Sequence, residues 1–458
     1  MPATTSRTPP ARCTGRWWRR CRSSRKTSAP PPRDGNQGAA SASINVLKAI
    51  APVRSLLLAI FLLMAGNGFM STLVSVRLEQ GGSSALVIGA VATAYFAGLI
   101  IGSLRAGLLV GSVGHIRAFA AFVSLLSVST LGYALHRDPV LWGMLRLIDG
   151  LCVAGVYVCL ESWLNERAES ETRGTVLAGY MIALYVGQAL GQYLLNLGTS
   201  LPSLPFVVAS MLVSLAAIPV ALTRIHAPPI VPVAGPQIRE LYAVSPLGVV
   251  GATITGLMLG GFYALGAVYA QRIGMTLSQV AFFMSAVILG GVALQYPLGI
   301  LSDRLDRRRV IVLAFAGTIA TSLGIVLVTE PGWPLLALGA LFGGLSFALY
   351  PLCVAHANDR LPPEQRVSAS SSLVLAYSLG AAGGPIAAAS ALTLAGPAGL
   401  FWFTGACGAL ALLFGLWRQL RAMPVPAEAQ GTYQILPRTT PMSAALDPSA
   451  EADQQEEP

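Results

Sequence analysis

Charged side chains are scarce in this chain of 458 residues, where Asp, Glu, Lys and Arg together make up 11%. An average soluble domain carries roughly 25%. Hydrophobic residues reach 54%, and the mean hydropathy is +0.64. A water-soluble surface cannot be built from so few charges, so the composition excludes an ordinary soluble protein and indicates a membrane protein.

Acidic residues are rarer than basic ones, with 20 Asp or Glu against 30 Lys or Arg, and the formal net charge is +10. Most of this excess lies in residues 1–45, which hold nine Lys or Arg and one acid, Asp34. The remainder is close to neutral, which excludes a nucleic-acid-binding surface there. Residues 1–45 are predicted to be a disordered basic tail attracted to lipid, or the product of an incorrectly assigned start codon.

Paired cysteines and catalytic signatures are also lacking. Of six cysteines, Cys152, Cys159, Cys353 and Cys407 lie in apolar runs and none forms a C-x-x-C pair. This favours buried hydrophobic side chains over disulfides or metal ligands. Because no Walker loop, G-x-S-x-G or H-E-x-x-H motif occurs, we expect no metal, no cofactor, no ATP-driven pumping and no enzymatic activity.

The chain does contain long apolar runs of about 20 residues, each long enough to cross roughly 30 Å of hydrocarbon as a helix. Twelve occur, at 55–76, 86–109, 117–135, 140–164, 174–197, 204–223, 246–270, 278–301, 310–328, 334–357, 367–394 and 398–417. The sequence therefore predicts an all-α membrane protein with one six-helix bundle at 50–223 and another at 246–418. Residues 224–245 would form a central cytoplasmic loop, and residues 419–458 a disordered C-terminal tail.

The two halves repeat one another at an offset of 192 to 194 residues. Gly107, Gly114 and Arg117 return as Gly299, Asp306 and Arg309, while Gly150, Arg173, Gly187 and Gly191 return as Gly344, Arg366, Gly380 and Gly384. A duplication of this size predicts two pseudo-symmetric membrane bundles that face one another across a pseudo-two-fold axis. Such an architecture is typical of transporters.

The distribution of cations predicts the orientation. Beyond residue 45, 16 Lys or Arg lie in loops on the side of the N-terminus, whereas the opposite loops carry Arg77, Arg137 and Arg272. Lys and Arg are retained on the cytoplasmic side. Both termini are therefore expected in the cytoplasm.

The loop between the eighth and ninth runs carries the sharpest motif, Gly299-Ile-Leu-Ser-Asp303-Arg304-Leu-Asp306-Arg307-Arg308-Arg309. It resembles the G-x-L-x-D-R-x-G-R-R-R signature of the major facilitator superfamily, with Asp306 in place of the second glycine. The equivalent turn of the first half keeps Gly107, Gly114 and Arg117 but has Gly111 in place of the acid.

The resemblance implies that this loop latches the two bundles together when the protein is open outward. Asp303 would lie at the positive end of the eleventh helix, and Arg304 or Arg307 would reach a carboxylate such as Asp359. Cations that only fix the topology are the alternative. The predicted latch comprises Gly107, Gly114, Arg117, Gly299, Asp303, Arg304, Arg307, His356 and Asp359.

The fourth run contains two opposite charges, Arg146 and Asp149, in a phrase that resembles the family's R-x-x-x-G-x-x-x-A pattern. One helical turn apart, they share a face, about 9 and 14 Å from the start of the run. A charge at that depth costs at least about 2.5–3.5 kcal/mol unless it is paired or faces water. We expect Asp149 to couple protons and Arg146 to set its proton affinity; a permanent structural pair is the alternative.

Glu161 lies near the inner end of the same run. It is predicted to line a cytoplasm-facing cavity as a further proton-coupling group, or to pair with Arg117 or Arg173.

Polar side chains elsewhere in the runs are candidates for a solvated central cavity that binds the solute. They are Asn67, Tyr157, Gln188 and Gln192 in the first half and Tyr263, Gln295, Tyr350 and Tyr377 in the second. The resemblance implies that helices one, four, seven and ten line this cavity. For each residue, an ordinary hydrogen bond between helices is the alternative. Gln188 stands where proton antiporters of the family usually have proline, which weakens an antiporter interpretation.

Three phrases, Glu161-Ser-Trp163, Gln295-Tyr-Pro297-Leu-Gly299 and Leu349-Tyr350-Pro351, are similar to a YcaD-like bacterial branch of the family. We therefore predict a secondary active transporter of a small organic solute, coupled to protons and working by alternating access between the bundles. It is expected as a monomer in the bacterial inner membrane, with no nucleic-acid partner. A membrane sensor or scaffold that keeps the fold without transporting is the alternative.

Overall fold

The structure is a computed structural model that describes residues 49–168, 172–199, 201–223, 237–328, 330–421, 430–431 and 433–440. All regular secondary structure in these residues is helical, and twelve helical stretches are long and apolar enough to cross a membrane. The predicted all-α class and twelve spans are therefore confirmed. The basic tail predicted at 1–45 lies outside the described residues.

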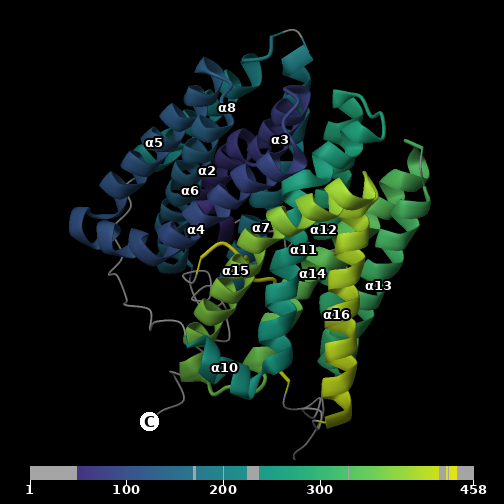
Figure 1. The fold of residues 1–458 in the computed structure, drawn as a ribbon. Coiled ribbons are helices and arrows are strands. Elements are labelled where there is room, and N and C mark those ends of the chain that lie inside the picture. Colours follow the sequence, from purple (N-terminus) through teal and green to yellow (C-terminus); the bar gives the residue numbers. More distant parts are fainter. Residues whose placement is uncertain are drawn as a thin grey trace, which may run out of the picture. The chain divides into compact units, whose positions relative to one another are not determined.

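Each half contributes six spans (Figure 1). The first half consists of η1 (Ala51–Val53), α2 (Arg54–Asn67), α3 (Met70–Gln80), α4 (Ala85–Val113), α5 (His115–Leu135), α6 (Pro139–Arg167), α7 (Arg173–Gly191), η2 (Gln192–Thr199), α8 (Leu204–Leu215) and α9 (Ala217–Ala221). The second half consists of α10 (Ile238–Val244), α11 (Pro246–Arg272), α12 (Leu277–Arg304), α13 (Arg307–Leu327), α14 (Trp333–Asn358), α15 (Pro363–Ala395) and α16 (Gly399–Arg421).

Local chemistry sets where several spans begin. The Asp138 carboxylate accepts a 2.7 Å hydrogen bond from the Leu141 N–H at the start of α6, and Thr276 forms a reciprocal capping box with Gln279 at the start of α12. Such caps satisfy donors that the first helical turn leaves unpaired. Gly114 separates α4 from α5 with a φ of +88°, a backbone conformation that favours glycine.

The duplicated glycines make equivalent close contacts in the two halves. A Cβ built on Gly187 would lie 2.6 Å from the carbonyl oxygen of Phe61, and one on Gly380 would lie 2.0 Å from that of Thr253. Each glycine thus lets α7 approach α2, or α15 approach α11, more closely than a side chain would permit. Because the glycines recur at an offset of 193 residues and their partners at 192, the internal repeat is a repeat of packing as well as of sequence.

A second contact is also duplicated: α4 packs against α6 in the first half, and α12 packs against α14 in the second. A Cβ on Gly98 would lie 2.1 Å from the carbonyl oxygen of Leu147, and one on Gly290 would lie 2.0 Å from that of Ala340. In Figure 1, α13 and α16 run side by side along the second bundle, as their contacts require.

The two bundles contact one another through hydroxyl side chains that reach backbone carbonyls. Thr93 on α4 donates to Ala382 on α15 over 2.9 Å, and Ser75 on α3 donates to Ala264 on α11 over 2.7 Å. We call the end of the bundles at the α11–α12 turn the Arg272 end, and the end at the α12–α13 loop the Arg307 end. At the Arg272 end, Arg272 forms a bidentate ion pair with Glu79, with distances of 2.7 and 3.0 Å.

Large apolar side chains cover the outer faces of many spans. Examples are Leu108, Leu135, Leu323, Leu394 and Leu413, all exposed. A water-soluble protein rarely exposes so much contiguous apolar surface, whereas a bilayer provides an apolar solvent for it.

The connector predicted at 224–245 contains a helix. Ile238–Val244 forms α10, which packs against α11 and α15, so this part of the connector is not an irregular loop. The Gln237 N–H donates to the Ser372 hydroxyl over 2.9 Å, which fixes the start of this helix to α15. The proline-rich part, residues 224–236, lies outside the described residues.

Candidate functional site

A cavity of about 150 Å³ lies between the two bundles. Its wall is formed by α2, α3, α4, α6 and α7 of the first half, α11 and α15 of the second, and residues 437–439. Five of the residues predicted from the sequence line it, namely Asn67, Tyr157, Gln188, Tyr263 and Tyr377. The wall is thus aromatic and polar in a protein that is otherwise mostly apolar.

Three other predicted residues lie outside this lining. The Gln192 amide is within 3.5 Å of the Gly68 carbonyl oxygen, and the Gln295 amide donates to the carbonyl of Phe347 over 3.3 Å. Tyr350 packs edge-on against Tyr377, with ring centres 5.3 Å apart. In each case the side chain contacts its neighbouring helix or ring and does not contribute to the wall.

Arg146 and Asp149 on α6 are both buried, but only Arg146 lines the cavity. Nη1 of Arg146 is 3.9 Å from Oδ2 of Asp149, and the Tyr133 hydroxyl donates to the same oxygen over 2.6 Å. Nη2 of Arg146 has no hydrogen-bond partner among the described residues. The guanidinium therefore connects the cavity to a carboxylate that the cavity itself does not reach.

Aromatic rings hold Arg146 in place. Its guanidinium carbon lies 5.4 Å from the ring centre of Tyr95 on α4 and 5.7 Å from that of Tyr133 on α5. Tyr133 in turn stacks on Phe206 and meets Trp142 edge-on. These contacts stabilise a cation that would otherwise be costly at this depth.

Glu161, three turns further along α6, has no exposed surface. It accepts a hydrogen bond from the Tyr180 hydroxyl over 2.8 Å and short hydrogen bonds from the hydroxyls of Thr439 and Thr440. Among the described residues, its hydrogen bonds come from these hydroxyls and not from Arg117 or Arg173. The carboxylate therefore faces the chain's own C-terminal segment.

That segment corrects the prediction of a disordered tail over 419–458. Helix α16 continues to Arg421, and residues 430–431 and 433–440 lie against the Arg307 end and extend into the cavity. In Figure 1 this yellow segment is visible between α7 and α15. Tyr433 and Leu436 are buried, and this burial stabilises a segment whose Pro- and Ala-rich surroundings resemble a linker. The other residues beyond 421 lie outside the described part of the chain.

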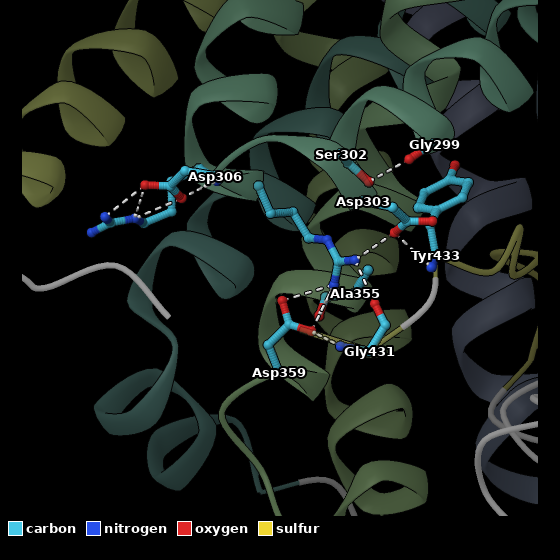
Figure 2. A network of polar contacts seen from close by, with 10 residues as sticks. Gly299, Ser302, Asp303, Asp306, Ala355, Asp359, Gly431 and Tyr433 are labelled. Atoms are coloured by element: carbon cyan, nitrogen blue, oxygen red, sulfur yellow. Dashed lines mark hydrogen bonds and ion pairs between the residues drawn. The ribbon is translucent and has the colours of Figure 1, made fainter. Parts of the chain in front are cut away.

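A polar network joins Asp303 of the signature-like loop to Asp359 and Gly431 (Figure 2), and the side chain of Arg307 makes the hydrogen bonds that connect them. Its Nη1 lies 2.7 Å from the Asp359 carboxylate and 3.1 Å from the Ala355 carbonyl oxygen. Its Nη2 donates to Asp303 over 2.9 Å and to the carbonyl of Gly431 over 2.8 Å. The structure thus contains the ion pair between Arg307 and Asp359 that the motif suggested.

The C-terminal segment completes this network. The Gly431 N–H donates to Asp359 over 3.0 Å, and the Tyr433 N–H donates to Asp303 over 2.9 Å. The Tyr433 ring packs on Gly299, where an added Cβ would lie 2.3 Å from a ring carbon. Burial raises the pKa of the Asp359 carboxyl above its ordinary value, although the Arg307 guanidinium opposes this shift.

The rest of the loop is bound more locally. Asp306 caps α13 and accepts hydrogen bonds from the Arg308 side chain, the shortest being 2.8 Å. Burial opposes ionisation of Asp306, but the hydrogen bonds from Arg308 outweigh it and lower the pKa of the carboxyl. The Arg304 side chain is exposed.

The equivalent loop of the first half, between α4 and α5, makes fewer contacts than the loop around Arg307. Gly107 and Gly114 have open space where a Cβ would lie, and Arg117 is exposed. The two loops therefore differ in chemistry, as expected from Gly111, which stands where the second half has the acid Asp303.

His356, a further residue of the predicted latch, belongs to the second half and is buried near the foot of α14.

Several residues of the site were missed by sequence reasoning. Tyr95, Phe96 and Tyr185 line the cavity, and Phe347 packs behind Tyr263 with ring centres 6.0 Å apart. Arg438 and Thr439 also line it. In the sequence, Arg438 stands out only as a cation in a segment otherwise poor in charge. The aromatic residues lie within apolar runs and have the composition of an ordinary core.

Among the described residues, no group of three or more His, Cys, Asp or Glu could hold a metal ion.

Comparison with known proteins agrees with this architecture. The model of the Major Facilitator Superfamily matches residues 56–285 and 248–446. The "Uncharacterized MFS-type transporter YcaD" of Salmonella arizonae is 30% identical over 348 residues, covering 73% of this chain and 87% of the relative. The protein of the same name in Escherichia fergusonii is 30% identical over 338 residues, with the same two shares.

Solved structures agree in fold. The nucleoside transporter NupG superposes with a TM-score of 0.68 at 13% identity, covering 80% of this chain and 98% of that one. A bacterial homologue of the human lysosomal transporter Spinster, in an inward-facing and occupied conformation, gives 0.66 at 14% identity, covering 83% and 97%. The chain has twelve apolar spans in two repeated bundles and matches these relatives over most of its length. It therefore belongs to the Major Facilitator Superfamily and is a multi-pass membrane transporter.

Proposed function

We propose that the protein is a proton-coupled secondary transporter that moves a small organic solute through the cavity between its bundles. The observation that carries this proposal is the placement of Arg146, which lines the cavity on one side and approaches the buried Asp149 on the other. A solute that contacts Arg146 therefore acts directly on the neighbour that governs Asp149.

The coupling chemistry follows from the surroundings of Asp149. An ionised carboxylate without exposed surface is stabilised by the guanidinium at 3.9 Å and by the Tyr133 hydroxyl. When a solute in the cavity displaces Arg146 from Asp149, that stabilisation weakens and Asp149 takes up a proton. When the solute leaves, Arg146 returns and the proton is released. Glu161 provides a second carboxylate nearer the Arg307 end.

The proposal places the Arg307 end and both termini in the cytoplasm of a bacterial cell, with the chain in the inner membrane. The excess of Lys and Arg in the loops of that end supports this orientation. The bundles are in contact at the Arg272 end, while the C-terminal segment reaches the cavity from the Arg307 end. In this conformation the proposal therefore has the bundles closed at the Arg272 end, with the C-terminal segment occupying the route between the cytoplasm and the cavity.

The loop at the Arg307 end serves as the conformational latch in this proposal. Asp303, Arg307 and Asp359 hold the feet of α12, α13 and α14 together, and their contacts to Gly431 and Tyr433 tie the C-terminal segment to the same place. Alternating access requires the first bundle to close on this end. The C-terminal segment must then leave the Arg307 end. Its hydrogen bonds to Arg307, Asp303 and Asp359 would be replaced by contacts between the two bundles.

Accumulation in proteoliposomes tests the proposal. Purified protein is reconstituted with an imposed proton gradient and offered a panel of radiolabelled organic cations, nucleosides, sugars and amino acids. We expect uptake or extrusion of at least one class that ceases when a protonophore collapses the gradient. A panel with no gradient-dependent movement of any member, from protein shown to be folded, would contradict the proposal.

A sensor or scaffold that does not transport is the second candidate, and one observation favours it. The cavity holds residues 437–439 of the chain itself, which is the arrangement expected of a protein that responds to a ligand by releasing its own segment. Solute movement in the proteoliposome experiment separates the two, because a sensor binds a ligand without carrying it across.

A further inference from the structure

The Arg438 guanidinium lies among three aromatic rings of the second bundle. Its central carbon is 4.5 Å from the ring centre of Phe347, 5.5 Å from that of Tyr377 and 5.9 Å from that of Tyr263. Nη2 also donates to the Tyr263 hydroxyl over 3.2 Å. We call Tyr263, Phe347 and Tyr377 the aromatic cage. Rings that surround a cation at these distances attract it through the negative faces of their π systems.

The cage is part of the helices and does not depend on the C-terminal segment for its construction. Tyr263 comes from α11, Phe347 from α14 and Tyr377 from α15, and the rings contact one another or their neighbours directly. Tyr185 of α7 adds a ring 5.8 Å from Phe347 across the junction of the bundles. Helix packing therefore holds the rings in place for any cation that enters.

Charges around the cavity also favour a cation. Arg146 on the opposite wall is balanced by Asp149, whereas Glu161 brings a carboxylate whose described partners are all hydroxyl groups. Arg438 is the cation nearest to the cage, and it belongs to the occupying segment. Once that segment leaves, the Glu161 carboxylate loses the Thr439 and Thr440 hydroxyls, and the aromatic faces lose the cation that now accompanies them.

We propose that the aromatic cage is the head-group subsite for a planar organic cation of the guanidinium class, and that Arg438 occupies it as a tethered stand-in. Glu161, which now accepts hydrogen bonds from Thr439 and Thr440, takes hydrogen-bond donors further along the same ligand. A free cation and the C-terminal segment therefore exclude one another. This inference rests on the proposed function only in taking the cavity as the solute site.

Binding of phenylguanidinium to the purified full-length protein, measured by isothermal titration calorimetry, tests the proposal. The neutral isostere phenylurea serves as the matched ligand control. Because a tethered competitor lowers the apparent affinity by the fraction of time it occupies the site, Arg438→Gln is expected to bind phenylguanidinium at least about tenfold more tightly than wild type. Arg438→Lys, which keeps the charge, is expected to bind much as wild type does.

Two further comparisons assign the effect to the cage. In the Arg438→Gln background, Phe347→Leu is expected to lower phenylguanidinium affinity at least about threefold, because a cation–π contact is lost while the volume is nearly kept. Gln434→Ala, on the same segment but outside the cage, should match wild type. Phenylurea should bind Arg438→Gln at least about tenfold more weakly than phenylguanidinium does.

Equal affinity of wild type and Arg438→Gln for phenylguanidinium would overturn the proposal, as would equal affinity of Arg438→Gln for the cation and for phenylurea. Binding requires no proton gradient, so it is separable from transport. A protein that binds phenylguanidinium in the cage yet moves no solute would contradict the proposed function and support this inference. One that accumulates only neutral or anionic solutes and ignores phenylguanidinium would do the reverse.

Discussion

Arg307 and Asp359 form a buried ion pair, with Nη1 of the guanidinium 2.7 Å from the carboxylate, and the N–H of Gly431 donates to the same carboxylate. Two helices, α13 and α14, are thereby joined to a segment that lies more than seventy residues further along the chain. The loop that resembles the family signature thus holds the C-terminal segment in this conformation.

Replacement of Arg307 by Ala should release the C-terminal segment. The change removes the donor to Gly431 and leaves Asp359 buried without its partner, a loss of about 3–5 kcal/mol for a buried pair. Hydrogen–deuterium exchange at Tyr433 and Leu436 should therefore be at least about tenfold faster than in wild type. Arg304→Ala, an exposed cation in the same loop, is the matched control, and equal protection in both variants would refute the docking role.

Acidification should neutralise Asp359 before Asp306. Burial raises the pKa of Asp359, whereas hydrogen bonds from Arg308 outweigh burial and lower the pKa of Asp306. As the pH falls, the carboxyl with the raised pKa takes its proton first, so the pair with Arg307 weakens while the pair between Asp306 and Arg308 persists. In infrared difference spectra, the carboxyl band that is lost in Asp359→Asn should appear at higher pH than the band that is lost in Asp306→Asn; the opposite order would contradict this prediction.

Glycines at the duplicated helix contacts should resist substitution. Gly380→Ala would place a Cβ 2.0 Å from the Thr253 carbonyl oxygen, so α15 must move away from α11 at a cost of about 1–3 kcal/mol. Its thermal unfolding temperature in detergent should fall. Gly143→Ala on α6, where nothing lies within 4 Å of the added carbon, should be neutral or slightly stabilising. Similar melting of the two variants would show that the close contact is not required.

The ion pair between Arg272 and Glu79 should favour the conformation in which the Arg272 end is closed. Arg272→Glu replaces attraction by repulsion between the bundles, and both side chains are partly exposed, so a change of about 1 kcal/mol is expected. Spin labels at Ser83 and Glu330 should then report longer distances. The exchanged pair Arg272→Glu with Glu79→Arg should restore the wild-type distribution; if the single change leaves that distribution untouched, the pair does not bias the conformation.

Much of the fold could be predicted from the sequence because its signals are local. A run of apolar residues has to cross the bilayer as a helix, and two charges one turn apart have to share a face, which placed Arg146 beside Asp149. The motif at the Arg307 end similarly suggested the pairing with Asp359. These inferences need only helical geometry and the cost of a charge in hydrocarbon.

The remaining parts of the site depend on contacts between residues far apart in the chain. Phe347 and Tyr185 have the composition of ordinary core, and only the meeting of α7, α11 and α14 brings their rings together. Arg438 follows a segment rich in proline and alanine, which has the composition of a linker. The position of its side chain is stabilised by a cage that the segment itself does not encode.

Solute-dependent proton movement in proteoliposomes containing Asp149→Asn tests the central claim most directly. Glu330→Gln, an exposed carboxyl between α13 and α14, is the control. With pyranine inside the vesicles and any solute that wild type moves, the account predicts wild-type proton flux for Glu330→Gln and none for Asp149→Asn. Proton flux and pH dependence in Asp149→Asn equal to those of wild type would contradict it.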